Sequence, residues 1–286
     1  MFAGFETVEM ELDGATIHAK VGGAGAPVLL LHGYPQTHAM WSAAAETLAR
    51  SYRVVAADLR GYGDSIAKDG DFTFRAMARD QVALMERLGH PAFHVVAHDR
   101  GARTTHRMVL DHADHVRSVV LIDILPTLDV WRLMDDWLAQ RYYHWLFLSQ
   151  PGDMPRRLIS GDPVMFLHAA LAGLSGGLEV FDKDALAEYE RAARDPEVVA
   201  AWCGDYSAAA TTDLDHDRAD LGRVSEIPCL VLWGSRGAVA HHVDPLELWR
   251  KWFPNARGHA IDGGHFLVEE RTAETLQAVT AHLESV

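Results

Sequence analysis

The sequence of 286 residues predicts an α/β fold in which a mostly parallel sheet is flanked by helices. Short, continuous apolar runs, typical of strands buried on both faces, alternate with segments of helical periodicity. Polar residues directly follow several runs, as at the carboxyl edge of a parallel sheet, where ligands bind. Between residues 125 and 223 the strand signals disappear and aromatic residues become frequent. We therefore expect one core, residues 1–124 and 224–286, and a helical cap inserted at residues 125–223.

The first half of the chain predicts a hairpin followed by repeated strand–helix units. Residues 5–22 alternate between apolar and polar, and Asp13-Gly14 is a hairpin signal. Buried strands are expected at residues 27–31, 52–57, 93–98 and 118–122, with helices at 40–49, at 77–88 and from 101 onward. The segment around Asp99 is thus a strand, a sharp turn with a polar residue at its tip, and a helix.

The second half predicts the cap and then a return to the core pattern. Within the cap, helical periodicity is interrupted at Pro151, Pro155, Gly161 and Gly173. Residues 227–233 resume the strand pattern. Asp244-Pro245 then starts a helix, with Asp as the N-cap and Pro in the first turn. A short strand at residues 260–261 and a helix over 268–283 close the chain.

Charge and composition exclude several classes of protein. The formal net charge of −14 argues against a nucleic-acid partner and leaves no basic face for a membrane. No run approaches the roughly 20 apolar residues of a membrane span, and no signal peptide is visible. The two cysteines, Cys203 and Cys229, lie in different segments, as expected for free thiols in a reducing compartment. We expect a soluble cytoplasmic protein, in which local arginines still permit an anionic substrate.

Three candidate catalytic residues, Asp99, Asp123 and His265, each follow a strand-like run. Because the carboxyl ends of parallel strands meet at one edge of a sheet, we expect their side chains to converge there. On position alone, Asp99 is also compatible with a plain helix N-cap.

Several motifs point to one family. The widely shared ones are His32-Gly33-Tyr34-Pro35-Gln36-Thr37-His38, Asp58-Leu59-Arg60-Gly61-Tyr62-Gly63 and Gly264-His265-Phe266-Leu267. The others are His98-Asp99-Arg100-Gly101-Ala102-Arg103, Asp123-Ile124-Leu125-Pro126, His144-Trp145 and Asp205-Tyr206. On these motifs nearly the whole chain resembles the fluoroacetate dehalogenase (haloacetate dehalogenase) family of the α/β-hydrolase superfamily. Ala97 stands where that family usually has Gly, and Ala is still small enough for a tight turn. The resemblance implies an α/β-hydrolase fold and a homodimer.

The resemblance also implies a nucleophile, a base and an acid. Asp99 is the nucleophile that displaces a leaving group from an sp³ carbon and forms an ester. His265 is the general base that activates water to hydrolyse the ester, because imidazole titrates near neutrality. Many relatives place the acid after the strand that here ends at Trp233, but Gly234-Ser235-Arg236-Gly237 contains no acid. The resemblance therefore implies that Asp123 accepts a hydrogen bond from the other ring nitrogen and orients the imidazole. We expect no cofactor.

Arg100 and Arg103 carry the main prediction about the substrate. They are three residues apart on an incipient helix, so their side chains can lie on one side of it. Two guanidinium groups beside an anionic nucleophile suit a substrate carboxylate, which they can bind by paired hydrogen bonds. The alternative is a structural ion pair with an acid of the cap.

Donors for a leaving halide are expected from the cap. The resemblance assigns this role to His144, Trp145 and Tyr206, which all carry N–H or O–H donors. His144 and Trp145 are adjacent and would diverge by about 100° on a regular helix, so the pocket must wrap a helix end or an irregular turn. The backbone N–H groups of Tyr34 and Arg100 are expected to form the oxyanion hole by analogy with the fold.

The leading hypothesis is a hydrolase that releases halide from short 2-haloacids, fluoroacetate above all. An epoxide hydrolase with the same triad is the alternative, with Tyr142, Tyr143, Tyr189 or Tyr206 as proton donors. A neutral epoxide, however, does not require two arginines. A non-catalytic small-molecule receptor is the third hypothesis, and an intact nucleophile, base and acid argue against it.

Two further patterns carry no function. Gly173-Leu174-Ser175-Gly176-Gly177 has the letters of a serine-hydrolase elbow, but no strand precedes it. The histidines show no metal-ligand spacing, since neither the pair His112 and His115 nor the pair His241 and His242 has a ligand cluster nearby. We therefore expect no metal.

Overall fold

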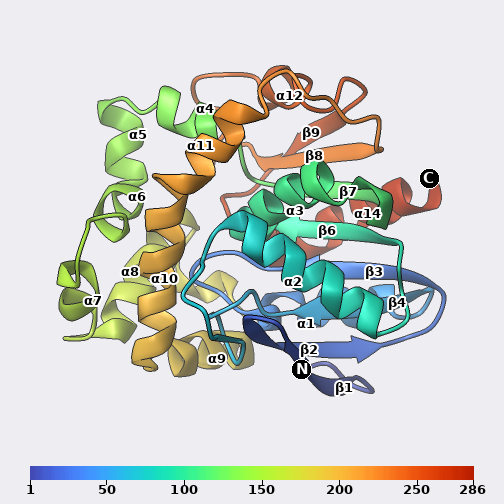
Figure 1. Ribbon diagram of the computed structural model, residues 1–286, viewed down its shortest axis with the longest axis horizontal. Helices are drawn as coiled ribbons and strands as arrows, with labels where there is room; N and C mark the ends of the chain where they lie inside the picture. Colours follow the sequence, from blue (N-terminus) through green and yellow to red (C-terminus); the bar gives the residue numbers. More distant parts are fainter.

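The computed structural model covers residues 1–286 and contains a nine-stranded sheet (Figure 1). The strands are β1 (Glu6–Leu12), β2 (Ala15–Gly22), β3 (Ala26–Leu31), β4 (Tyr52–Ala57), β5 (Ile66–Ala67), β6 (Phe93–His98), β7 (Val116–Ile122), β8 (Cys229–Gly234) and β9 (Arg257–Ile261). They are ordered β1-β2-β4-β3-β6-β7-β8-β9, and β5 pairs with β2. Strand β2 is antiparallel to β1, β4 and β5, whereas all pairings from β4 to β9 are parallel. The predicted fold class is confirmed.

Helices cover the two faces of this sheet. In the core they are α1 (Ser42–Leu48), α2 (Phe74–Arg87), α3 (Asp99–Asp111), α12 (Pro245–Trp249), α13 (Leu267–Glu270) and α14 (Thr272–Glu284), with short 3₁₀ turns at His38–Trp41 and Ala113–His115. Figure 1 shows α2 and α3 side by side in front of the strands, and α1 and α14 behind them. The N-cap prediction for Asp244 is confirmed, because its carboxylate accepts from the backbone N–H of Leu246 at 2.9 Å.

The chain between β7 and β8 forms helices only. They are α4 (Thr127–Arg132), α5 (Asp136–Arg141), α6 (Tyr143–Leu148), α7 (Met154–Ile159), α8 (Pro163–Leu174), α9 (Lys183–Ala193), α10 (Pro196–Ala209) and α11 (Thr212–Ala219), with a 3₁₀ turn at Leu178–Val180. They lie together at one end of the sheet, on the left of Figure 1. The division of the chain at residues 124 and 224 stays a prediction, and we refer to these helices as the cap.

Three local predictions differ from the structure. The helix expected at 40–49 is a 3₁₀ turn followed by α1, and the helix expected from residue 101 already begins at Asp99. The closing helix is divided into α13 and α14 at Arg271, whose φ and ψ of −141° and 51° are not helical. Strand β5 was not predicted, because two residues show no periodicity.

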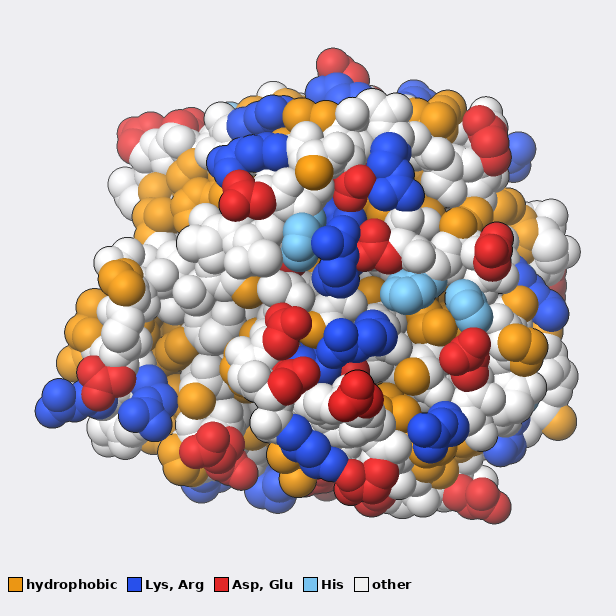
Figure 2. Space-filling view, in the orientation of Figure 1, with side chains coloured by type: hydrophobic (Ala, Val, Ile, Leu, Met, Phe, Trp, Pro, Cys, Tyr) orange, Lys and Arg blue, Asp and Glu red, His pale blue; other side chains and the backbone are white.

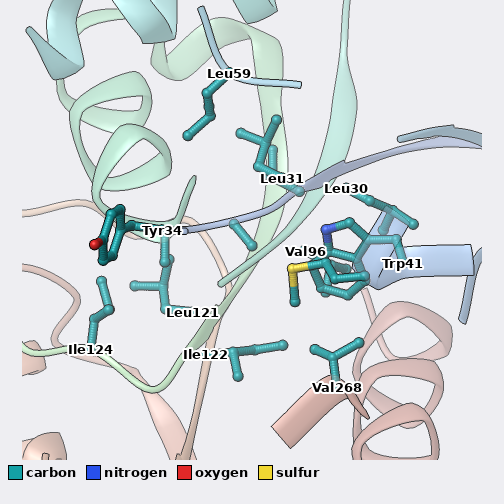
Figure 3. Packing of buried hydrophobic residues seen from close by; sticks show 14 of the residues in the cluster. Leu30, Leu31, Tyr34, Trp41, Leu59, Val96, Leu121, Ile122, Ile124 and Val268 are labelled. Carbon is teal, nitrogen blue, oxygen red and sulfur yellow. The ribbon is translucent and has the colours of Figure 1, made fainter. Parts of the chain in front are cut away.

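The core lies around the central strands β3, β6 and β7. Figure 3 shows Leu30, Leu31, Val96, Leu121 and Ile122 from these strands packed together, with side chains from covering elements on either side. All five are fully buried, as is most of each run that predicted the central strands. None of the helices has both the length and the apolar character needed to cross a membrane.

Candidate active site

Asp99 lies at the sharp turn between β6 and α3. Its φ of +42° is in the left-handed region that side chains rarely adopt, so the turn is strained. The turn brings α3 very close to the end of β3: the N–H of Gly101 donates to the carbonyl of His32 at 2.8 Å. A Cβ at Gly101 would lie 2.5 Å from that carbonyl oxygen, which explains a glycine there. The strained turn holds the Asp99 carboxylate at the edge of the sheet.

The structure brings His265 and Asp123 together, as predicted. His265 Nδ1 lies 2.6 Å from Asp123 Oδ2, and both side chains are buried. The other oxygen, Oδ1, accepts from the backbone N–H of Gly234 at 2.7 Å. Asp123 is itself held at a φ of +53°, directly after β7. Its position fixes the imidazole in one orientation and leaves Nε2 free.

Charges around the site keep Asp99 ionised. Burial alone raises the pKa of the Asp99 carboxyl, but the positive charge of His265 and of the two arginines outweighs burial and lowers this pKa. Arg103 Nε lies 3.9 Å from Asp99 Oδ1. Burial lowers the pKa of His265, yet the hydrogen bond and charge of Asp123 raise it above 6.5 overall. An ionised carboxylate thus lies near a basic imidazole.

Arg100 is held by the cap. Its Nε donates to Asp205 Oδ2 at 2.8 Å, and its Nη2 donates to the carboxylate and to the backbone oxygen of Asp205 at 3.1 Å. Tyr62 Oη donates to the same carboxylate at 2.6 Å. The ion-pair alternative therefore accounts for one edge of Arg100. Its Nη1, however, is buried without a partner.

Arg103 is held by the core and by the start of the cap. Its Nη1 donates to the carbonyl of Leu125 at 2.9 Å and to Thr127 Oγ1 at 3.1 Å. Its Nε is buried without a hydrogen-bond partner. The guanidinium lies over the Trp145 ring, with Cζ 4.6 Å from the ring centroid. Both arginines thus keep one buried donor unused.

Aromatic side chains of the cap lie near Asp99. Tyr206 lies 5.6 Å from His144, 5.7 Å from Trp145 and 5.1 Å from Tyr34, measured between ring centroids. Helix α6 begins at Tyr143, and Tyr142 before it has φ −104° and ψ 33°. His144 and Trp145 are thus in the first turn after a break, which is the irregular geometry that the sequence required. Burial lowers the pKa of His144 to about 3, so its imidazole is neutral and donates one N–H.

The backbone N–H of Tyr34 faces the Asp99 carboxylate. It donates to Asp99 Oδ2 at 3.0 Å, while Arg100 is the second residue of α3, whose N-terminus carries partial positive charge. This arrangement favours negative charge on the oxygens of Asp99 and on any tetrahedral intermediate formed there.

Sequence reasoning did not predict the residues that hold the arginines in place. Asp205 stands out in the sequence only as part of a motif, and it is 105 residues from Arg100 in the chain. Tyr62 likewise lies within a widely shared motif, and Thr127 lies in none. No local pattern marks such partners, because they come together only when the cap folds onto the core.

One cluster of possible metal ligands lies outside this site. His18, His38 and Asp58 are buried together within 4.8 Å of one another. Asp58 accepts from the backbone N–H groups of His38 and Asp64 and from His38 Nδ1. Hydrogen bonds inside the protein therefore account for this carboxylate.

Comparison with known proteins agrees with this geometry. The profile of the α/β-hydrolase-fold family matches residues 26–272, so the chain belongs to the α/β-hydrolase family. Within the family, it is 42% identical to a fluoroacetate dehalogenase of Burkholderia sp., with 99% of this chain and 95% of that protein covered. It is 30% identical to a soluble epoxide hydrolase of Corynebacterium sp. (strain C12), with 91% of each covered.

Solved structures agree over the full length. A Nostoc sp. PCC 7120 protein provisionally classed as an α/β hydrolase superimposes with a TM-score of 0.96 at 44% identity, covering 99% of both chains. A single-residue variant of a Pseudomonas aeruginosa protein provisionally classed as an epoxide hydrolase, solved with bound MFA, gives a TM-score of 0.96 at 43% identity. That alignment covers 99% of this chain and 97% of the other.

The positions of the tyrosines separate the two enzymatic hypotheses. Tyr189 lies in a different contact, where its hydroxyl donates to Glu269 at 2.9 Å. Tyr143 is 42% exposed on the outside of the cap. Tyr142 and Tyr206 remain near the nucleophile, and both are buried. Neither tyrosine explains the unused donors of the arginines, so the epoxide hypothesis is not favoured.

Proposed function

We propose that this protein is a hydrolytic dehalogenase that converts short 2-haloacids, fluoroacetate in particular, to the 2-hydroxy acid and halide. The observation that carries the proposal is the pair of buried, unused donors, Arg100 Nη1 and Arg103 Nε, beside the ionised Asp99. A buried donor without a partner costs about 1–3 kcal/mol. A substrate carboxylate would accept from both arginines and hold its own halogen-bearing carbon near Asp99.

In the first step, an oxygen of Asp99 attacks the carbon that bears the halogen. A carbon–oxygen bond forms, the carbon–halogen bond breaks, and the halide leaves with the bonding electrons. His144, Trp145 and Tyr206 donate to the departing halide. Several donors are needed for fluoride, because it is small and costly to desolvate. The product of this step is a glycolyl ester on Asp99.

In the second step, His265 takes a proton from water, and the resulting hydroxide attacks the ester carbonyl of Asp99. Asp123 stabilises the imidazolium that forms. The backbone N–H groups of Tyr34 and Arg100 hold the oxyanion. Collapse of the intermediate breaks the bond between the Asp99 carbonyl carbon and the oxygen of the 2-hydroxy acid, which takes the proton from the imidazolium of His265. The Asp99 carboxylic acid then ionises to restore the carboxylate.

We also propose that the active protein is a homodimer formed through the cap. The outer cap patch consists of the exposed apolar residues Tyr143, Leu146, Met154, Leu158 and Met165, which are 37–63% exposed on α6, α7 and α8. Figure 2 shows apolar atoms gathered over these helices on the left side of the molecule. Contiguous exposed apolar surface is typical of an interface, and twofold dimers are the commonest assemblies. The two free cysteines support a reducing compartment such as the cytoplasm.

The test is a halide-release panel with fluoro-, chloro- and bromoacetate. We expect the protein to release fluoride from fluoroacetate, and Asp99→Asn to release none above background. Equal release by the protein and by Asp99→Asn would refute the proposal. Turnover of a neutral epoxide that survives Arg103→Ala would favour the epoxide hydrolase instead.

A further inference from the structure

The loop that carries His265 is anchored through three successive backbone N–H groups. Gly264 donates to Glu270 Oε2 at 2.8 Å, and Phe266 donates to Glu270 Oε1 at 3.1 Å. Between them, the N–H of His265 donates to the carbonyl of Leu174 in the cap at 3.0 Å. One carboxylate therefore holds both neighbours of the base, each with one of its oxygens.

The fold places Glu270 beneath this loop for a clear reason. Helix α13 is only four residues long, so Glu270 at its end is close enough to reach back to the residues before it. The carboxylate fills the space beside Gly264, where a Cβ would lie 2.7 Å from Glu270 Oε1. A glycine at 264 and a carboxylate at 270 thus fit each other.

We propose that Glu270 is a positioning residue for the general base, a role that rests on the proposed function. A carboxylate has only acceptors, so it can receive both N–H groups at once. The isosteric amide of glutamine has one acceptor oxygen and one N–H₂ group, which would face a backbone N–H. Loss of the carboxylate therefore releases one side of the His265 loop and rotates the imidazole away from the attacking water.

The inference concerns the second chemical step only. The attack of Asp99 on carbon uses the two arginines, the halide donors and the turn between β6 and α3. None of these groups contacts Glu270. Ester hydrolysis requires the imidazole within hydrogen-bond distance of water, and misplacement of about 1 Å costs about 100-fold in rate. Loss of Glu270 should therefore leave the first release of halide intact and slow the turnover that follows.

Glu270 also contributes charge to the base. It lies with His265 and Asp123 around a cavity of about 210 Å³ between core and cap. The titratable groups around His265 include Asp123, Asp99, Glu270, His98 and His144, and the charged side chains of Arg141 and Arg236 line the same cavity. The three carboxylates raise the pKa of His265, whereas the two histidines are neutral because burial lowers the pKa of each to about 3. Removal of the Glu270 charge therefore lowers the pKa of His265. The pH below which turnover falls, because the base becomes protonated, moves down with it.

The test compares Glu270→Gln with Glu274→Gln, a control at an exposed position on α14. Rapid-quench measurement of fluoride release from fluoroacetate is expected to give, for Glu270→Gln, a burst of one fluoride per chain at the original rate. Steady turnover after the burst should be at least about tenfold slower than in the original protein. The pH below which this turnover falls should also be lower. Glu274→Gln should match the original protein. Glu270→Ala, which removes the same carboxylate and adds no amide, should reproduce the burst and provides the measurement if Glu270→Gln does not fold.

Unchanged turnover and pH profile in Glu270→Gln would overturn the inference. Equal slowing of burst and turnover would also overturn it, because that pattern indicates general damage to the site. Titration of the His265 imidazole by NMR measures the effect of Glu270 on this side chain without substrate. Glu270→Gln should lower the midpoint of the His265 titration. If the original protein releases no fluoride while this midpoint still shifts, the proposed function fails and the positioning role stands.

Discussion

Asp99 combines features that conflict in most buried sites: a left-handed φ, nearly complete burial and a negative charge. The charge persists because His265, Arg103 and Arg100 surround it. Its place near Asp123 and His265 could be predicted, since Asp99 and Asp123 directly follow β6 and β7 and His265 lies in the loop after β9. The ion pair between Asp205 and Arg100 could not be predicted, because no sequence pattern indicates which acid of the cap contacts which arginine.

The pH dependence of the two steps should differ. Asp99 has a lowered pKa and stays ionised in mild acid, whereas the pKa of His265 is raised above 6.5. A general base works only when neutral, so hydrolysis of the ester should fail first as the pH drops below neutrality. Rapid-quench assays in mild acid should show one fluoride per chain and slow turnover thereafter. Loss of the burst together with turnover would contradict this assignment.

Arg103 should contribute strongly to binding of the substrate carboxylate. Arg103→Gln removes a charge-assisted hydrogen bond worth about 1.5–3 kcal/mol, so kcat/KM for fluoroacetate should fall by about 10- to 100-fold. Arg132→Gln, at an exposed arginine of α4, is the matched control and should have no effect. Comparable losses in both variants would argue against a specific role for Arg103.

At the scale of elements, the cap is fastened to the core by buried polar contacts between α3 and α10.

Apolar runs predicted the strands well, residues 52–57 with the observed bounds, because burial on both faces leaves a plain signal. The break between α13 and α14 was not predicted, and Glu270 at the end of α13 accepts from the N–H groups on either side of His265. Periodicity finds long elements and passes over short ones, whose positions depend on tertiary contacts.

The contact between Arg100 and Asp205 should contribute to stability as well as to geometry. Asp205→Asn leaves the fully buried Arg100 without its countercharge, which costs about 3–5 kcal/mol in comparable pairs. Urea unfolding should show a loss of this size, together with a raised KM for fluoroacetate. Asp215→Asn, at an exposed aspartate of α11, should leave the midpoint unchanged. A fully stable Asp205→Asn would mean that the pair holds neither the cap nor Arg100.

At the scale of the whole molecule, the cap has an inner and an outer face. Its inner face brings His144, Trp145 and Tyr206 toward Asp99, and its outer face carries the outer cap patch, which is the proposed dimer interface. Leu158→Asp places a charge in that patch and should convert a dimer to a monomer in sedimentation equilibrium. Leu221→Asp, at an exposed leucine outside the patch, is the control. A dimer that tolerates Leu158→Asp would place the interface elsewhere.

The central claim is that Asp99 forms an ester with the substrate. His265→Asn cannot activate water, so a reaction with fluoroacetate should stop after the first step. Mass spectrometry of the digested protein should find one carboxymethyl group on the peptide that contains Asp99, together with one fluoride released per chain. Fluoride release with Asp99 unmodified, or an adduct on a different residue, would contradict the account.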